Sequence, residues 1–144
     1  MSDHTPLLTR ITEALERLAP PPPPPVDWLA HPAYVWLGRT ARPVARLDAP
    51  ALDLMHGIDF QKGAVVESVA RLAHGAAAHD MLLWGSRGMG KSALLRAATL
   101  AAQAERPGSI ALVQATPEAG LADLFALLRG IDRRFLVFLD DLGF

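Results

Sequence analysis

The stretch "MLLWGSRGMGKSALLRAATLAAQA", residues 81–104, decides the fold. It opens with a short apolar run at 81–84, continues through a glycine-rich loop, and ends in an alanine-rich segment at 91–104. Apolar residues recur at helical spacing in that last segment, with Leu94 and Leu95 facing inward. This order predicts a strand, a tight loop and a helix, and such an arrangement is typical of phosphate-binding loops.

The loop "GSRGMGKS", residues 85–92, matches the pattern G-x-x-x-x-G-K-[ST] at every fixed position. Glycine lets the backbone N–H groups approach phosphate oxygens closely, and the following helix directs the positive end of its dipole at the same place. Lys91 would reach the β- and γ-phosphates, and the Ser92 hydroxyl would bind the Mg²⁺ that bridges them. The candidate nucleotide-binding residues of the loop are Gly85, Ser86, Arg87, Gly88, Met89, Gly90, Lys91 and Ser92. Arg87 and Met89 stand at variable positions, so we expect no specific role for their side chains.

Helices and strands alternate along the rest of this region. The runs 109–114 and 134–139 predict two more strands, and the segments 61–74 and 117–128 predict helices, the second capped by Thr116. Strands that alternate with helices of this length favour a parallel sheet covered by helices. We therefore expect an α/β fold with a parallel sheet of three strands, 81–84, 109–114 and 134–139.

Two carboxylates follow the last of these strands. Asp140 comes directly after the apolar run "RFLVFL", where a second nucleotide motif would place a Mg²⁺ ligand. Asp141 stands where many ATPases carry the carboxylate that orients or activates the attacking water. The alternative is that either aspartate only caps a turn, which the upstream loop makes the weaker interpretation.

The N-terminal part is different. Residues 5–18 predict an amphipathic helix with Thr5 as its cap, and Pro20 to Pro25 predict a stiff polyproline spacer. A docking ligand for a proline-reading domain is a less common use of such a run. Residues 33–47 predict two short strands around a turn at 38–42. We divide the chain into a helix and linker, 1–32, and an ATP-binding domain, 33–144.

Composition limits the other possibilities. A net charge of −1 gives no reason to expect a nucleic acid or an anionic membrane as partner. The absence of cysteine excludes disulfides, thiolate metal sites and a thiol nucleophile, and it fits a cytoplasmic protein. No stretch approaches the roughly 20 apolar residues of a spanning helix. The histidines are scattered without ligand spacing.

Three tracts together resemble the AAA-type P-loop ATPases of the domain of unknown function 815 family. They are "LMHGIDFQK" at 54–62, "LLWGSRGMGKSALL" at 82–95 and "RFLVFLDDLGF" at 134–144. The phosphate loop is generic to many ATPases, so the tract around Gly57 and the "LLWG" run point to this family in particular. The resemblance covers about residues 33–144.

The resemblance implies a three-layer AAA-type module that binds ATP and Mg²⁺. Gly57 and Ile58 would line the adenine pocket, Lys91 and Asp141 would serve catalysis, and Ser92 and Asp140 would hold the metal. It also implies a homo-oligomer, since such ATPases use an arginine from a neighbouring subunit. The strand order of this class, 5-1-4-3-2 in chain order, would leave an empty position between 81–84 and 134–139.

We therefore expect "RFLVFL" to pair in parallel with "SIALVQ" at 109–114, and not with the strand at 81–84. The sensor residues and lid of the class have no counterpart in this sequence, so we expect the front half of a longer protein, with hydrolysis only in the complete form. Two alternatives remain: a P-loop kinase of a small molecule, and a nucleotide-dependent interaction module without turnover.

Overall fold

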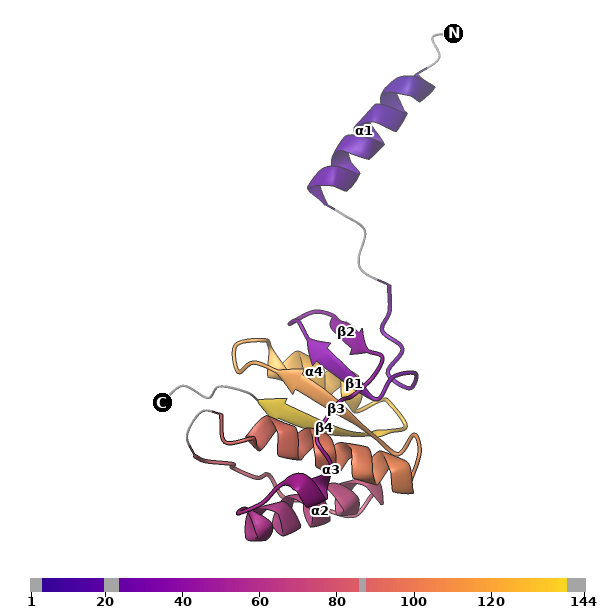
Figure 1. The fold of residues 1–144 in the computed structure, drawn as a ribbon. Coiled ribbons are helices and arrows are strands. Elements are labelled where there is room, and N and C mark those ends of the chain that lie inside the picture. The colour runs from indigo at the N-terminus through magenta and orange to yellow at the C-terminus, as the bar shows by residue number, and fades with distance from the viewer. Residues whose placement is uncertain (1–3, 20–23, 86–87, 140–144) are drawn as a thin grey trace.

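The structure is a computed structural model, and it describes residues 4–19, 24–85 and 88–139. Its elements run in the order α1 (Thr5–Leu18), β1 (Ala33–Trp36), β2 (Ala41–Val44), η1 (Leu52–Leu54), α2 (Asp59–Ala73), α3 (Lys91–Glu105), β3 (Ile110–Ala115), α4 (Leu121–Leu128) and β4 (Arg134–Leu139). Figure 1 shows a sheet with helices on both faces, and α1 standing apart from this body. The predicted α/β class is confirmed.

The described part of the chain forms one sheet, with the strand order β2-β1-β3-β4. β3 pairs in parallel with β4, in the register Ile110 to Arg134, as predicted for the two apolar runs. β1 joins the other side of β3 in parallel, and β2 closes a hairpin antiparallel to β1. The prediction of a wholly parallel sheet is wrong, because the hairpin at 33–44 adds an antiparallel strand at the edge.

The segment 81–84 is not a strand, which corrects the sequence prediction. It runs as irregular chain and belongs to no strand pair of the described sheet. A strand forms only where a neighbour accepts its backbone hydrogen bonds, and no strand of the described sheet pairs with "MLLW". Consequently Trp84 remains 88% exposed and Leu82 66% exposed.

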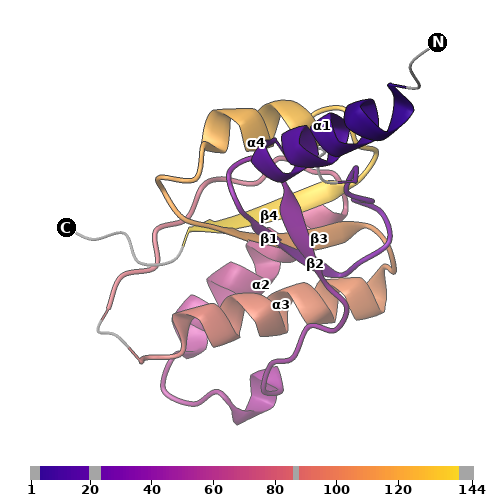
Figure 2. The ribbon, with the colours of Figure 1, turned by 90° about the horizontal axis from the view of Figure 1, so that it is seen from above.

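The sheet separates two apolar clusters. On one face, Val65, Val69 and Ala73 of α2 pack with Leu94, Leu95 and Ala98 of α3 against Ile110. On the other face, Leu124 and Leu128 of α4 pack with Trp28, Tyr34 and Trp36 against Ala111 and Val113. Figure 2 shows α4 on the side of the sheet opposite to α2 and α3. The alternation of side chains along β3 therefore supplies both layers of the core.

Arg133 fastens the segment before β1 to the sheet. Its guanidinium donates hydrogen bonds to the carbonyl oxygens of His31, at 2.7 Å, and Ile110, at 2.9 Å. It also donates to the carbonyl of Trp28 at 3.1 Å, while the Trp28 ring stacks against Tyr34 and meets Phe135 edge-on. Burial lowers the pKa of Arg133 from its ordinary value. The segment around Trp28 is thus part of the core, although it precedes the first strand.

Two predicted helix starts differ from the structure. α4 begins at Leu121 rather than at 117, because Gly120 takes a left-handed conformation with φ of 67° directly before it. Thr116 instead accepts a turn hydrogen bond on its carbonyl from the Ala119 N–H. α1 has His4 at its N-cap position, so Thr5 is the first residue of the helix and not its cap. The helix predicted over 61–74 is Asp59–Ala73, and the one over 91–104 is Lys91–Glu105.

Among the described residues, no helix combines the length and the apolar character that crossing a membrane requires.

Candidate nucleotide-binding site

The candidate site is the loop that leads into α3. Gly90 is the residue before the helix, and its carbonyl accepts the first helical hydrogen bond, from the Leu94 N–H at 2.8 Å. No side chain caps this helix start. The first N–H groups of a helix have no partner within the helix, and the start of a helix is therefore a place that favours an anion.

Glycine is required in this loop by the backbone. Gly85, Gly88 and Gly90 have φ values of 141°, 81° and 78°, which side chains other than glycine adopt rarely and at a cost. Space is not the reason at two of them, since a Cβ on Gly88 or Gly90 would meet no atom within 4 Å. The three glycines that the sequence singled out are therefore the ones that give the loop its course.

Lys91 lies at the mouth of this loop. Its Nζ donates a hydrogen bond to the Gly85 carbonyl oxygen at 2.8 Å, which joins the two ends of the loop. Ser92 follows it in the first turn of α3 and is partly buried. Ser86 and Arg87, predicted as part of the same loop, lie outside the described residues.

The end of β4 faces the same side of the molecule as the start of α3 (Figure 1). β4 ends at Leu139, so the predicted Mg²⁺ ligand Asp140 and the predicted catalytic residue Asp141 lie outside the described residues. Within the described ranges, no group of three or more histidine, aspartate or glutamate side chains is placed to hold a metal ion.

Gly57 and Ile58 stand at the beginning of α2. Gly57 has a φ of 76°, and Ile58 is the N-cap residue of the helix. The Ile58 side chain is half-buried and packs against the apolar cluster that α2 and α3 share. This links the tract to α3, the helix that carries Lys91.

Lys62 holds this tract in place, a role that the sequence reasoning missed. Its Nζ donates to the carbonyl oxygens of Met55 at 2.9 Å and Leu52 at 3.3 Å, and lies 3.0 Å from an Asp59 carboxylate oxygen. The turn η1 is thereby fastened to the first turn of α2. The sequence offered one hint that Lys62 has a specific role, because Lys62 and Lys91 are the only lysines of the chain.

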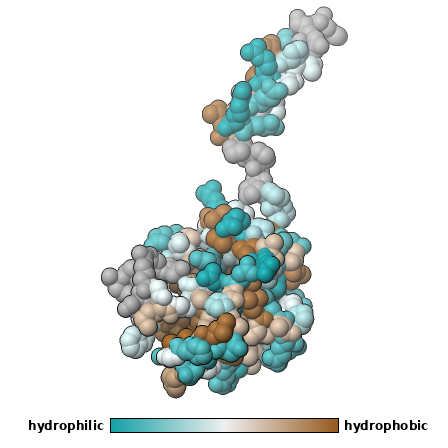
Figure 3. Space-filling view, viewed as in Figure 1, coloured by the Kyte–Doolittle hydropathy of each residue, from teal (hydrophilic) through white to brown (hydrophobic). Residues whose placement is uncertain are grey.

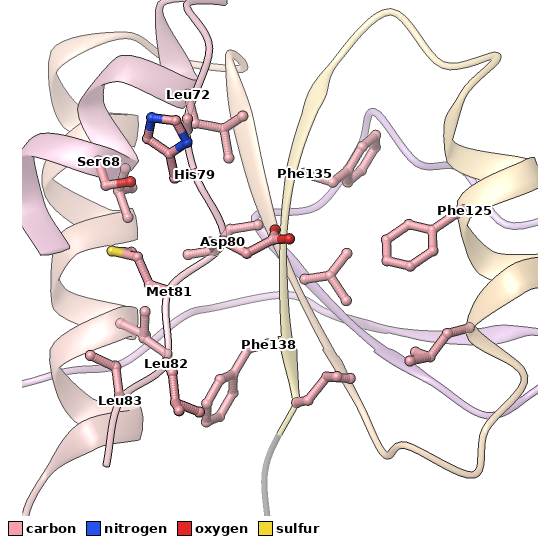
Figure 4. A pocket seen from close by; sticks show the side chains of 17 residues that line it. Ser68, Leu72, His79, Asp80, Met81, Leu82, Leu83, Phe125, Phe135 and Phe138 are labelled. Carbon is pink, nitrogen blue, oxygen red and sulfur yellow. The ribbon is translucent and has the colours of Figure 1, made fainter. Parts of the chain in front are cut away.

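A groove separates β4 from the segment that approaches the loop. Its volume is about 470 Å³, and it is lined on one side by residues 78–83 and on the other by residues 135–139 of β4. Figure 4 shows Met81, Leu82 and Leu83 on one side, with Phe138 of β4 pointing towards Leu82 and Leu83. Phe135 and Phe125 lie on the other side of β4, and Asp80 lies close to the strand between them (Figure 4). Residues 78–83 and β4 therefore face each other across a largely apolar groove.

Comparison with known families gives one match. Residues 29–144 match the family described as "Protein of unknown function (DUF815)", which is most of the chain. The chain belongs to this family, as its three tracts suggested. Comparison with curated proteins and with solved structures finds no match.

Proposed function

We propose that this member of the DUF815 family binds Mg-ATP through residues 85–92, as an AAA-type P-loop module does. The observation that carries the proposal is the loop itself. Three glycines with positive φ lead into the N-terminus of α3, and the Lys91 ammonium group is held at that point by the Gly85 carbonyl.

The chemistry of this arrangement suits a polyphosphate. The positive end of a helix dipole favours an anion, and glycine keeps side chains away from it. Lys91 can exchange its bond to the Gly85 carbonyl for bonds to phosphate oxygens, which are stronger because both partners are charged. Ser92, one residue later, would bring its hydroxyl to the Mg²⁺ bound to those phosphates.

Hydrolysis is a separate part of the proposal. Asp140 would bind Mg²⁺ and Asp141 would orient the attacking water. Both follow the C-terminal end of β4, which faces the same side of the molecule as the N-terminus of α3 (Figure 1). We assign turnover to an oligomer, in which a neighbouring subunit would supply an arginine. Gly57 and Ile58 are our candidates for residues that line the adenine pocket. We also propose that the protein acts in the cytoplasm.

Equilibrium dialysis of the chain against labelled ATP, with Mg²⁺ or with EDTA, tests the proposal. We expect ATP to bind, and to bind more tightly with Mg²⁺. Ser92→Ala should reduce the advantage that Mg²⁺ gives, because it removes a proposed metal ligand, whereas Ser68→Ala in α2 serves as the matched control. No ATP binding by the folded chain would contradict the proposal, and so would an equal Mg²⁺ effect in both variants.

A further inference from the structure

The helix α1 carries a large apolar surface that nothing in the described structure covers. Five of its side chains are 55% to 83% exposed, and none of its residues is buried. These five are Leu7, Leu8, Ile11, Leu15 and Leu18. Figure 3 shows brown, apolar side chains along α1, away from the rest of the molecule.

A helix of this kind is not expected to persist alone in water. It has 14 residues and no side-chain cap, and its first turn contains no acidic residue. Thr9 and Thr12 bond back to backbone carbonyls four residues earlier, which does not strengthen a helix. Isolated helices shorter than about 12–15 residues are marginal, so most of the stability of α1 must come from packing its apolar face.

The spacing of the apolar residues matches the seam of associating helices. Leu8, Ile11, Leu15 and Leu18 follow one another at intervals of three, four and three residues, which is the a-d-a-d pattern of a heptad. Leu7 and Ala14 widen this stripe on one side, as in helices that face the core of a bundle.

The distribution of charge favours a second copy of the same helix as the partner that covers the apolar stripe of α1. In this heptad, the positions that flank the seam are Thr5, Leu7, Thr12 and Ala14, and none of them carries a charge. The charged residues, two arginines and two glutamates, lie on the remaining face and sum to zero: Arg10, Glu13, Glu16 and Arg17. Two identical faces can therefore meet without repulsion. A lipid surface is a poorer fit, because helices that lie on membranes are rich in lysine and arginine on their polar face.

The sequence that follows α1 argues against a contact within the same chain. Six consecutive prolines, Pro20 to Pro25, separate it from the sheet domain. A proline run favours an extended form of about 3.1 Å per residue, and it acts as a semi-rigid spacer. Such a spacer presents the helix to another molecule more readily than it folds the helix back.

We propose that α1 is a self-association element, whose apolar stripe packs against the α1 helices of other copies of this chain. The proposal does not depend on nucleotide binding. It assigns a use to the N-terminal part, which lies outside the residues that match the family.

Sedimentation equilibrium of the whole chain tests this. We expect a mass of two or more chains. Leu15→Asp should shift the chain to its monomer mass, whereas Thr9→Asp, with the same added charge on the opposite face of the helix, should not. Leu15→Ala removes the apolar contact but raises the helix propensity of α1, so it does not act by unfolding the helix. It should weaken association at least about tenfold.

Three results would overturn the proposal. One is a monomer at all concentrations. The second is association that Leu15→Asp leaves unchanged, which would place the contact on another surface, such as the groove beside β4. The third is a monomeric chain that sediments with phosphatidylserine vesicles through α1, which would make the lipid surface the occupant.

Discussion

Tyr34 is the only tyrosine of the chain, and its environment predicts an unusual titration. It is almost completely buried, its hydroxyl donates to the Asp27 carbonyl at 2.6 Å, and burial raises its pKa above the ordinary value of 10.0. The phenolate absorbance of the native chain should therefore appear at higher pH than that of the chain unfolded in urea. The unfolded state then loses its proton first, so the free energy of unfolding should fall as the pH rises above 10.0. Coincident native and unfolded titrations would contradict the burial of Tyr34.

Arg133 should contribute strongly to stability, although no carboxylate in the described part of the chain pairs with it. Arg133→Met would leave the His31 carbonyl without its donor, whereas the Ile110 carbonyl would keep the hydrogen bond from the Gln103 side-chain amide at 3.1 Å. Each buried group left unsatisfied costs about 1–3 kcal/mol, so the free energy of unfolding should fall by at least that amount. Urea denaturation measures it, with Arg129→Met on the exposed end of α4 as control. Equal effects of the two substitutions would mean that the Arg133 bonds are not made.

Two glycines should respond to alanine in opposite directions. Gly90 has a φ of 78°, so Gly90→Ala should cost about 1–2 kcal/mol of stability. Gly63 lies within α2, has no positive φ, and offers open space to a Cβ, so Gly63→Ala should add about 0.5–1 kcal/mol. Thermal unfolding of both variants checks this, and stabilisation by Gly90→Ala would show that the loop does not take this conformation.

At the scale of the elements, sequence patterns identified the apolar runs and the helices, but they did not show which run finds a partner strand or which glycine sets a helix start. The run at 134–139 is a strand as predicted, because β3 lies beside it. The equally apolar run at 81–84 is not, since no strand pairs with it. The start of α4 was missed because the pattern does not reveal that Gly120 takes a left-handed conformation. The glycines of the phosphate loop were predictable, because only backbone geometry selects them.

β4 gives an element-scale prediction for hydrogen exchange. The Arg134 N–H bonds to the Ser109 carbonyl of the β3 side, so alternate N–H groups along β4 point towards β3. The amides of Leu136 and Phe138 should exchange slowly, whereas those of Phe135 and Val137 should exchange quickly, because they face the groove. Slow exchange at Val137 would mean that another backbone is bound there.

At the scale of the whole molecule, the sheet, the groove and the loop fit one arrangement. β4 pairs with β3 on one side and borders an apolar groove on the other. Apolar surface beside an open strand edge favours association with other chains. We therefore expect the chain to be prone to aggregate through this edge.

The central claim is that the loop before α3 binds a nucleotide through Lys91. Isothermal titration of Mg-ATP into the wild-type chain, Lys91→Ala and Arg106→Ala tests it directly, because Arg106 offers the same charge loss at the opposite end of the same helix. We predict that Lys91→Ala weakens binding about tenfold to hundredfold, as expected for loss of a charged hydrogen bond, and that Arg106→Ala leaves it unchanged. Equal affinity of all three folded proteins for Mg-ATP would contradict the account.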